Sequence, residues 1–267
     1  MQSVAEKTVI VTGSNKGIGY WIIAQMMKQK LPYKIILCSR SLENGEKAIA
    51  ELVSEPWGQD YKDRISCGVL DITSKDSCVS FSKWFTETHK SVDVIVNNAG
   101  FAYKGSVFNT EVLKETFATN YDGTIFFQET MRDLLNQNGK VIYVASGAGP
   151  MTLNRLSEGM QARFMDPNLT EDGLWKLKQE MCDDLDAEKF EERGWTNWGY
   201  GLSKMFLEAY VLWQGKQEFY QKKNVQVIFW ENLKKRSTRC AQAGAGPTWR
   251  PKERQKALRR ALILFCG

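Results

Sequence analysis

The chain has 267 residues, of which 43% are hydrophobic and 25% are charged, and its formal net charge is +5. A chain of this length can bury one large core. Its longest apolar runs are only as long as a strand, which disfavours a membrane protein, and residues 1–7 contain no hydrophobic signal core, which disfavours secretion. A cytoplasmic location is therefore expected. Six cysteines without a Cys-x-x-Cys pair, and His89 as the single histidine, offer too little for a metal site, and no metal is expected.

Short apolar strands alternate with amphipathic helical segments along the whole chain. Strands are expected near residues 8–11, 35–38, 65–70, 92–96, 140–145 and 225–230. Helical segments between them include 43–53, 75–88, 111–118 and 199–220. This alternation predicts an α/β fold of the Rossmann type, a doubly wound parallel sheet with helices on both faces. Ligands of such sheets bind at the carboxyl ends of the strands.

A glycine-rich segment, TGSNKGIG at 12–19, follows the first predicted strand and leads into a predicted buried helix at 21–27. Glycines let the backbone turn tightly and approach a pyrophosphate, and the free N–H groups at the start of the helix then bind the anion. The candidate cofactor-binding residues in this segment are Gly13, Asn15, Lys16, Gly17, Ile18 and Gly19. The spacing Gly-x3-Gly-x-Gly differs from Gly-x-Gly-x-x-Gly, so a tight turn that binds nothing is the alternative.

Segments with polar or charged residues also follow the next four predicted strands. They are Arg40, Asp71, Asn97–Gly100 and Ser146. Because the carboxyl ends of parallel strands meet at one edge of a sheet, we expect these residues and the glycine segment to line one crevice.

Tyr200 and Lys204 stand four residues apart in a predicted helix. Positions i and i+4 share one helix face, so the lysine charge lies near the phenol. A nearby cation lowers a tyrosine pKa from its usual value of about 10 toward the range where the phenol can transfer protons at neutral pH. Taken alone, the pair has an ordinary alternative, an aromatic ring packed beneath a long lysine stem.

Together these motifs resemble the short-chain dehydrogenase/reductase family and, within it, the monomeric NADPH-dependent carbonyl reductases. The matching pieces run in order through residues 8–228 and are Thr12–Gly19, Leu70–Ile72, Asn97–Gly100, Thr119–Asn120, Ser146 and Tyr200-x-x-x-Lys204. The resemblance implies hydride transfer from NADPH to the carbonyl of a small-molecule aldehyde, ketone or quinone.

The resemblance also implies a role for each matching residue. Tyr200 would donate the proton, Ser146 would polarise the carbonyl, Asn120 would hold a water for proton relay, and Lys204 would contact both Tyr200 and the nicotinamide ribose. The implied cofactor contacts beyond the glycine segment are Asp71, which would meet the adenine, and Ile72, Asn97, Ala99, Gly100, Tyr200 and Lys204.

Charge favours NADPH over NADH. An NAD site usually has an acid after the second strand for the ribose hydroxyls, whereas this chain has Ser39 and Arg40 there and Lys16 in the glycine segment. Two cations suit the 2′-phosphate of NADPH. The alternative is that both are ordinary solvated surface side chains.

An insertion of unusual length, at about 150–195, separates Ser146 from Tyr200. In the carbonyl reductases that the chain resembles, such an insertion adds helix beside the site and covers the surface used by other members to oligomerise, so a monomer is expected. Trp195, Trp198 and Met160 are candidates for the wall of an apolar substrate pocket, with core packing as the alternative for each.

The C-terminal end departs from the family. Residues 231–267 hold ten lysines and arginines against two acids, a net charge of +8 that leaves −3 for residues 1–230. We therefore expect a reductase domain at 1–230, an atypical basic tail at 231–267, and no final strand. Codons for residues 240–250 read two bases out of frame permit Cys-Pro-Gly-Trp-Cys-Arg-Thr-Asp-Met, which resembles the family's own ending, and we interpret the tail as the product of a frameshift or altered splice near 229–239.

The tail defines a second class of function, a catalytically impaired or non-catalytic relative of the reductases. Nucleic acid is not an expected partner, because the positive net charge comes entirely from the tail, and charge runs are more often solvated than bound. No membrane partner is expected either.

Overall fold

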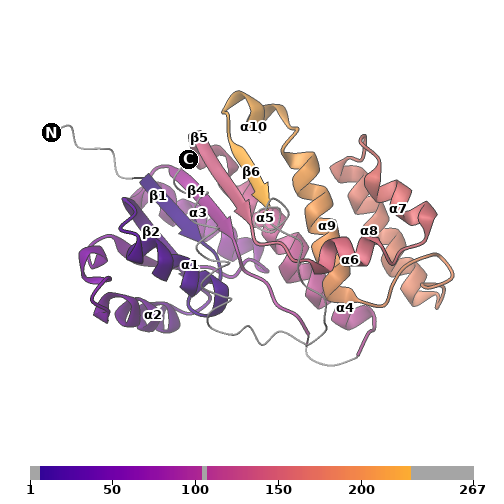
Figure 1. Cartoon of the computed structure of the whole chain (residues 1–267), viewed down its shortest axis with the longest axis horizontal. Coiled ribbons are helices and arrows are strands. Elements are labelled where there is room, and N and C mark those ends of the chain that lie inside the picture. The colour runs from indigo at the N-terminus through magenta and orange to yellow at the C-terminus, as the bar shows by residue number, and fades with distance from the viewer. Residues whose placement is uncertain (1–6, 104–106, 230–267) are drawn as a thin grey trace.

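The computed structural model describes residues 7–103 and 107–229 (Figure 1). Six parallel strands form one sheet in the order β3-β2-β1-β4-β5-β6. The strands are β1 (Lys7–Val11), β2 (Tyr33–Ser39), β3 (Ile65–Val69), β4 (Val92–Asn97), β5 (Leu135–Tyr143) and β6 (Gln226–Phe229). The predicted doubly wound sheet is confirmed, with its strand order reversing between β1 and β4. The expected loss of a final strand concerns residues that lie outside the described ones.

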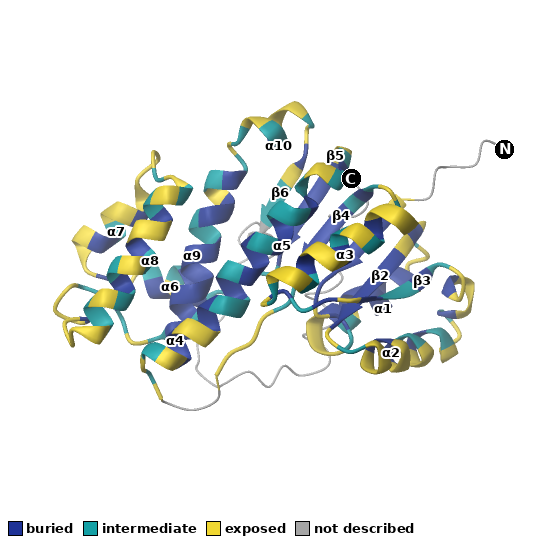
Figure 2. Cartoon of the chain, turned by 180° about the vertical axis from the view of Figure 1, so that it is seen from behind, coloured by how far each residue is buried: buried dark blue, intermediate teal, exposed yellow. Residues whose placement is uncertain are grey.

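Helices cover both faces of the sheet (Figures 1 and 2). They are α1 (Gly17–Lys28), α2 (Leu42–Ser54), α3 (Lys75–Thr88), α4 (Thr110–Phe117), α5 (Thr124–Met131), α6 (Ala148–Leu153), α7 (Glu158–Met165), α8 (Glu171–Asp186), α9 (Gly199–Gln214) and α10 (Glu218–Lys222). Two 3₁₀ turns, η1 (Gln59–Tyr61) and η3 (Arg132–Leu134), and the π-helix η2 (Ala118–Gly123) complete the described elements. Among the described residues, no helix is both long and apolar enough to cross a membrane.

Alternation along the strands divides the core into two layers. Val9 and Val11 of β1 pack with α1 and α2, whereas Ile10 between them belongs to the larger layer with α3, α5 and α9. Successive side chains of a strand point to opposite faces, so the continuous apolar runs predicted as strands serve both layers.

Short polar side chains set the beginnings of five helices. The capping residues, each accepting a hydrogen bond from a backbone N–H in the first turn, are Ser41, Ser74, Asn109, Ser157 and Thr170. Helix α1 differs, because Lys16 at its N-cap position makes no side-chain cap.

The predicted helix at 199–220 is two helices in the structure. Helix α9 ends at Gln214, Gly215 occupies the C-cap position, and α10 begins at Glu218. Glycine is a poor residue for a helix interior, which explains the break at this point.

Candidate active site

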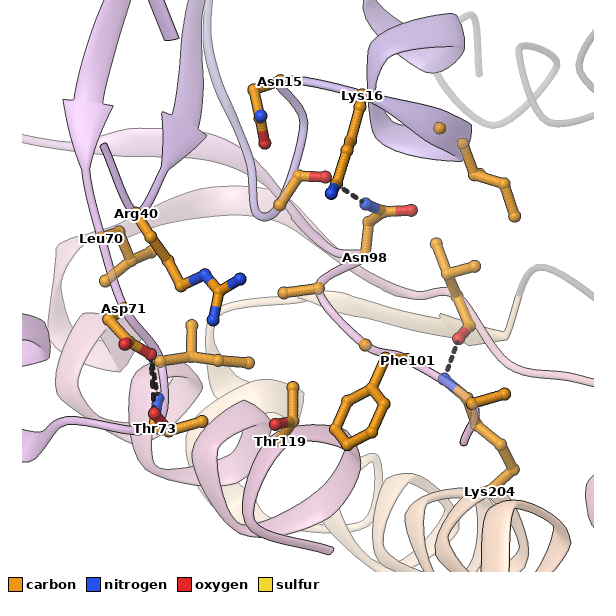
Figure 3. A pocket seen from close by; sticks show the side chains of 18 of the residues that line it. Asn15, Lys16, Arg40, Leu70, Asp71, Thr73, Asn98, Phe101, Thr119 and Lys204 are labelled. Atoms are coloured by element: carbon orange, nitrogen blue, oxygen red, sulfur yellow. Dashed lines mark hydrogen bonds between the residues drawn. The ribbon is translucent and has the colours of Figure 1, made fainter. Parts of the chain in front are cut away.

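A cavity of about 760 Å³ lies at the carboxyl ends of the strands (Figure 3). Its lining includes many of the residues singled out in the sequence: Gly13, Asn15, Lys16, Gly17, Ile18, Arg40, Asp71, Ile72, Ala99, Gly100, Tyr200 and Lys204. Small-molecule and cofactor sites usually enclose about 300–1,000 Å³. The residues that follow β1, β2, β3 and β4 therefore share one site of cofactor size with the first two turns of α9.

The same cavity has lining residues that sequence reasoning did not assign to the site. They are Leu70, Thr73, Phe101, Ala102, Thr119, Val144 and Ala145. Most of them adjoin a predicted site residue, so the motifs already indicated their position in the chain. Ala102 and Val144 adjoin no predicted site residue and carry no such signal. Asn98 also lines the cavity, and it belongs to the segment 97–100 that the sequence places there.

The glycine segment turns because two of its residues adopt a left-handed backbone. Gly13 has φ +58° and Gly17 has φ +64°, and a Cβ on Gly13 would lie 2.9 Å from Ala99 Cα. Gly19 does not line the cavity, since it packs beneath the turn, where a Cβ would lie 2.6 Å from Asn98 Nδ2. Helix α1 begins at Gly17 with no side-chain cap and no acid in its first turn, so its N-terminus is suited to an anion.

Hydrogen bonds tie this turn to the end of β4. Thr12 Oγ1 accepts from the backbone N–H groups of Asn98 at 3.0 Å and Ala99 at 2.9 Å. In return, Asn98 Nδ2 donates to the backbone oxygens of Thr12 at 2.8 Å and Gly13 at 3.1 Å. These bonds fix the distance between two walls of the cavity, the glycine turn and the segment that follows β4.

The two ends of the cavity differ in their chemistry. Figure 3 shows Arg40 and Asp71 at one end and Lys204 at the other. The carboxylate of Asp71 is oriented by its own turn, because Oδ1 accepts from Thr73 N at 3.0 Å and from Thr73 Oγ1 at 2.7 Å. Arg40 and Lys16 are exposed cations.

Tyr200 and Lys204 come together as their spacing in α9 predicts. Lys204 is only 5% exposed, its Nζ donates to Val144 O at 2.9 Å, and Nζ lies 6.0 Å from the centroid of the Tyr200 ring. The end of β5 thus fixes the ammonium on the same side of the cavity as the phenol.

Asn120 lies behind the cavity wall in the π-helix η2 and is fully buried. Its Oδ1 accepts from Phe101 N at 2.9 Å, and its Nδ2 donates to Phe101 O at 2.8 Å and to Ser203 Oγ at 3.1 Å. A Cβ on Gly100 would lie 2.9 Å from Asn120 Oδ1 and 3.7 Å from Lys204 Nζ, so the amide and the ammonium flank the same glycine.

Asn97 and Ser146, predicted in the sequence, are not among the cavity-lining residues. Asn97 points into the core, where its Nδ2 donates to Gln128 Oε1 at 3.0 Å. Ser146 is half-buried just beyond the lining residues Val144 and Ala145, and its Oγ accepts from Ala148 N at 3.2 Å.

The three candidates for an apolar pocket wall do not line the cavity either. Met160 and Trp195 are core residues, 4% and 3% exposed, which is the core-packing alternative. Trp198 is half-buried at the N-cap of α9 and stacks on the guanidinium of Arg155.

Comparison with known proteins identifies the class to which this fold and site belong. The family model for short chain dehydrogenases matches residues 7–158, more than half of the chain. The chain therefore belongs to the short chain dehydrogenase family and is an oxidoreductase.

Particular relatives narrow the similarity. Carbonyl reductase (NADPH) 3 of Rattus norvegicus is 28% identical over 206 residues, which cover 76% of this chain and 72% of that protein. Carbonyl reductase (NADPH) 1 of Mus musculus matches with the same identity and coverage.

Solved structures of plant reductases share the fold. Menthone neomenthol reductase from Mentha piperita superposes with a TM-score of 0.72 at 25% identity, covering 80% of this chain and 86% of that one. Salutaridine reductase from Papaver somniferum superposes with a TM-score of 0.71 at 22% identity, covering 84% and 85%.

Proposed function

We propose that this chain reduces the carbonyl group of a small molecule with NADPH. One observation carries the proposal: Tyr200 and Lys204 line the same cavity as the glycine turn and Arg40. The relatives named as NADPH carbonyl reductases support this choice of cofactor and reaction.

The cavity residues fit such a cofactor along its length. The N-terminus of α1 would bind the pyrophosphate, Arg40 and Lys16 would bind the 2′-phosphate, and Asp71 would contact the adenine. A side chain on Gly13 would clash with Ala99, so glycine permits the tight turn that would precede the pyrophosphate.

When bound, NADPH would supply the hydride to the carbonyl carbon, and residues of the chain would manage the proton. Tyr200 would donate its hydroxyl proton to the carbonyl oxygen, giving the alcohol. Lys204, fixed by its bond to Val144 O, would place a positive charge beside the phenol and favour proton release. The Ser146 oxygen already accepts from Ala148 N, which leaves its hydroxyl proton to polarise the carbonyl.

Replacing Tyr200 with Phe tests the proposal. The variant keeps the ring but loses the transferable proton. We expect its NADPH-dependent turnover of an aromatic aldehyde or quinone to fall by about 1,000-fold, which is within the rate loss usual when a general acid is removed. Binding of NADPH, followed by fluorescence titration, should change by less than about twofold, since the hydroxyl lies at the reaction end. Near-normal turnover in the variant would mean that another group supplies the proton.

We also propose that the protein is a cytoplasmic monomer. Leu174, Leu177 and Met181 of α8 are buried in one cluster with Phe117 of α4 and Phe206 of α9, so the insertion covers the outer faces of those helices. Light scattering on the purified chain should give a mass near 30.5 kDa. A mass near twice that value would contradict the proposal.

A further inference from the structure

Ser203, between Tyr200 and Lys204 in sequence, is completely buried and has two hydrogen-bond partners of different kinds. Its Oγ donates to the backbone oxygen of Tyr200 at 2.8 Å. The same oxygen accepts from Asn120 Nδ2 at 3.1 Å, across 83 positions of the chain. One hydroxyl therefore joins the π-helix η2 to the first turn of α9.

The directions of these bonds follow from what each group can donate. The Tyr200 carbonyl can only accept, so the single Ser203 proton must point to it. The serine oxygen is then left to accept from Asn120. Both Asn120 N–H groups are thereby used, one on Ser203 and one on Phe101 O, and Asn120 Oδ1 accepts from Phe101 N.

This set of bonds defines a single orientation for the Asn120 amide. A flipped amide would face its NH₂ group to the N–H of Phe101 and would offer only an oxygen to Phe101 O. The orientation matters for the cavity, because Phe101 lines it and because Asn120 Oδ1 and Lys204 Nζ flank Gly100.

A serine that bonds the carbonyl three residues earlier is common in helices and alone has only local effect. Ser203 differs because its oxygen also receives the Asn120 amide inside a fully buried site. Without that oxygen, one buried N–H of Asn120 loses its partner, and such a group tends to move to recover a hydrogen bond.

We propose that Ser203 is a positioning residue of this active site: it sets the Asn120 amide, and through it the Phe101 wall, relative to Tyr200. The inference rests on the proposed function of Tyr200. The hydrogen bonds of Ser203 and Asn120 form in the chain without cofactor, so the inference can be tested without measuring turnover.

Hydrogen–deuterium exchange provides that test on the full 267-residue chain. In the Ser203→Ala variant the helix keeps a good helix former but loses the oxygen, and the Phe101 amide should exchange about tenfold faster as its bond to Asn120 loosens. Thr116→Val is the matched control, since it also removes a buried hydroxyl, one that bonds only Val112 O of its own helix at 2.7 Å. Exchange at Phe101 should be unchanged in the control.

Steady-state kinetics provide a second test of the role of Ser203. Ser203→Ala should lower kcat by about tenfold, as expected for one unsatisfied buried N–H beside the site, while KM and NADPH affinity change by less than about twofold. In an Asn120→Ala background, where the amide is gone, the same serine change should have little further effect on kcat. If Ser203→Ala is insoluble, Ser203→Cys can replace it, because a thiol is a weaker hydrogen-bond donor and acceptor than a hydroxyl. Its effect on kcat is then measured with and without Asn120→Ala.

Unchanged exchange at Phe101, or effects of the Ser203 and Asn120 substitutions that simply multiply, would overturn the proposal. Failure of the proposed function is a separate result: it would appear as normal turnover in Tyr200→Phe or as absence of carbonyl reduction in the unaltered chain. In either case the exchange measurement still decides the role of Ser203.

Discussion

At the scale of a single side chain, we propose that Arg40 determines the choice between NADPH and NADH. Among the residues that line the cavity, Asp71 is the acid, and its carboxylate is already engaged by Thr73, whereas Arg40 and Lys16 are exposed cations. Arg40→Asp would place a carboxylate where we expect the 2′-phosphate. NADPH affinity should fall by about 100-fold, in line with loss of a charge-assisted hydrogen bond and added repulsion, and NADH affinity by less than about threefold.

Fluorescence titration with both cofactors measures this difference. Lys62→Asp is the control, because it makes the same charge change at an exposed residue that does not line the cavity. Equal losses of NADPH and NADH affinity in the Arg40 variant would contradict the charge argument.

Adjacent asparagines show where prediction of the site from sequence stops. The motif at 97–100 places this segment at the end of a strand, and the structure agrees. The side chains diverge: Asn97 bonds Gln128 in the core, and Asn98 bonds the glycine turn. Alternation predicts that neighbours in a strand point apart, but which of the two faces the cavity depends on partners far away in the sequence.

Helix α8 is attached to η2 by an ion pair at its middle. Lys178 Nζ lies 2.5 and 2.6 Å from the two carboxylate oxygens of Asp122, and the two side chains are 17% and 29% exposed. Burial raises the pKa of Asp122, and Lys178 opposes that rise. Lys178→Met should therefore destabilise the fold by about 1–3 kcal/mol at pH 7.5, since it leaves a half-buried carboxylate without its partner.

The pH dependence of this loss has a definite sign. With Lys178 gone, the folded-state pKa of Asp122 rises further above its unfolded value, so the carboxyl takes up a proton in the folded state first as pH falls. The destabilisation measured by urea unfolding should be smaller at pH 5 than at pH 7.5. Lys222→Met, which breaks an exposed pair with Glu218, should change stability little at either pH. A loss from Lys178→Met that does not vary with pH would point to lost packing of the lysine stem instead.

Strands were easier to predict than the segment that carries Asn120. Runs of apolar, β-branched residues mark β1, β2, β4 and β5 directly, whereas the predicted helix 111–118 continues in the structure as a π-helix into α5. No periodicity in the sequence indicates a π turn. Tertiary partners account for it: Asn120 is held by Phe101 and Ser203, and Gly123 packs so tightly that a Cβ would lie 2.5 Å from Ile72 O.

Across the whole molecule, the change in composition after β6 falls at the functional edge of the sheet. All strands are parallel, so the chain leaves β6 at the end where the cavity lies. In the family that the sequence resembles, a Pro-Gly turn and a Thr-Asp pair near the nicotinamide follow this strand. Here residues 231–267 carry a net charge of +8 instead. We propose that this chain keeps the cofactor contacts of Arg40 and the glycine turn but catalyses more slowly than a relative that has the family's own ending.

We therefore compare this chain with a variant in which the residues after 239 are replaced by the sequence of the alternative reading frame. The variant should turn over carbonyl substrates faster, by about tenfold or more, because small misplacements at a reacting centre cost one to two orders of magnitude in rate. Its affinity for NADPH should be similar, because the proposed phosphate and adenine contacts lie within residues 13–72. Turnover and limited proteolysis of both forms, at equal concentration, make the comparison. Equal turnover together with protection of residues 231–267 would show instead that this ending is a working part of the enzyme.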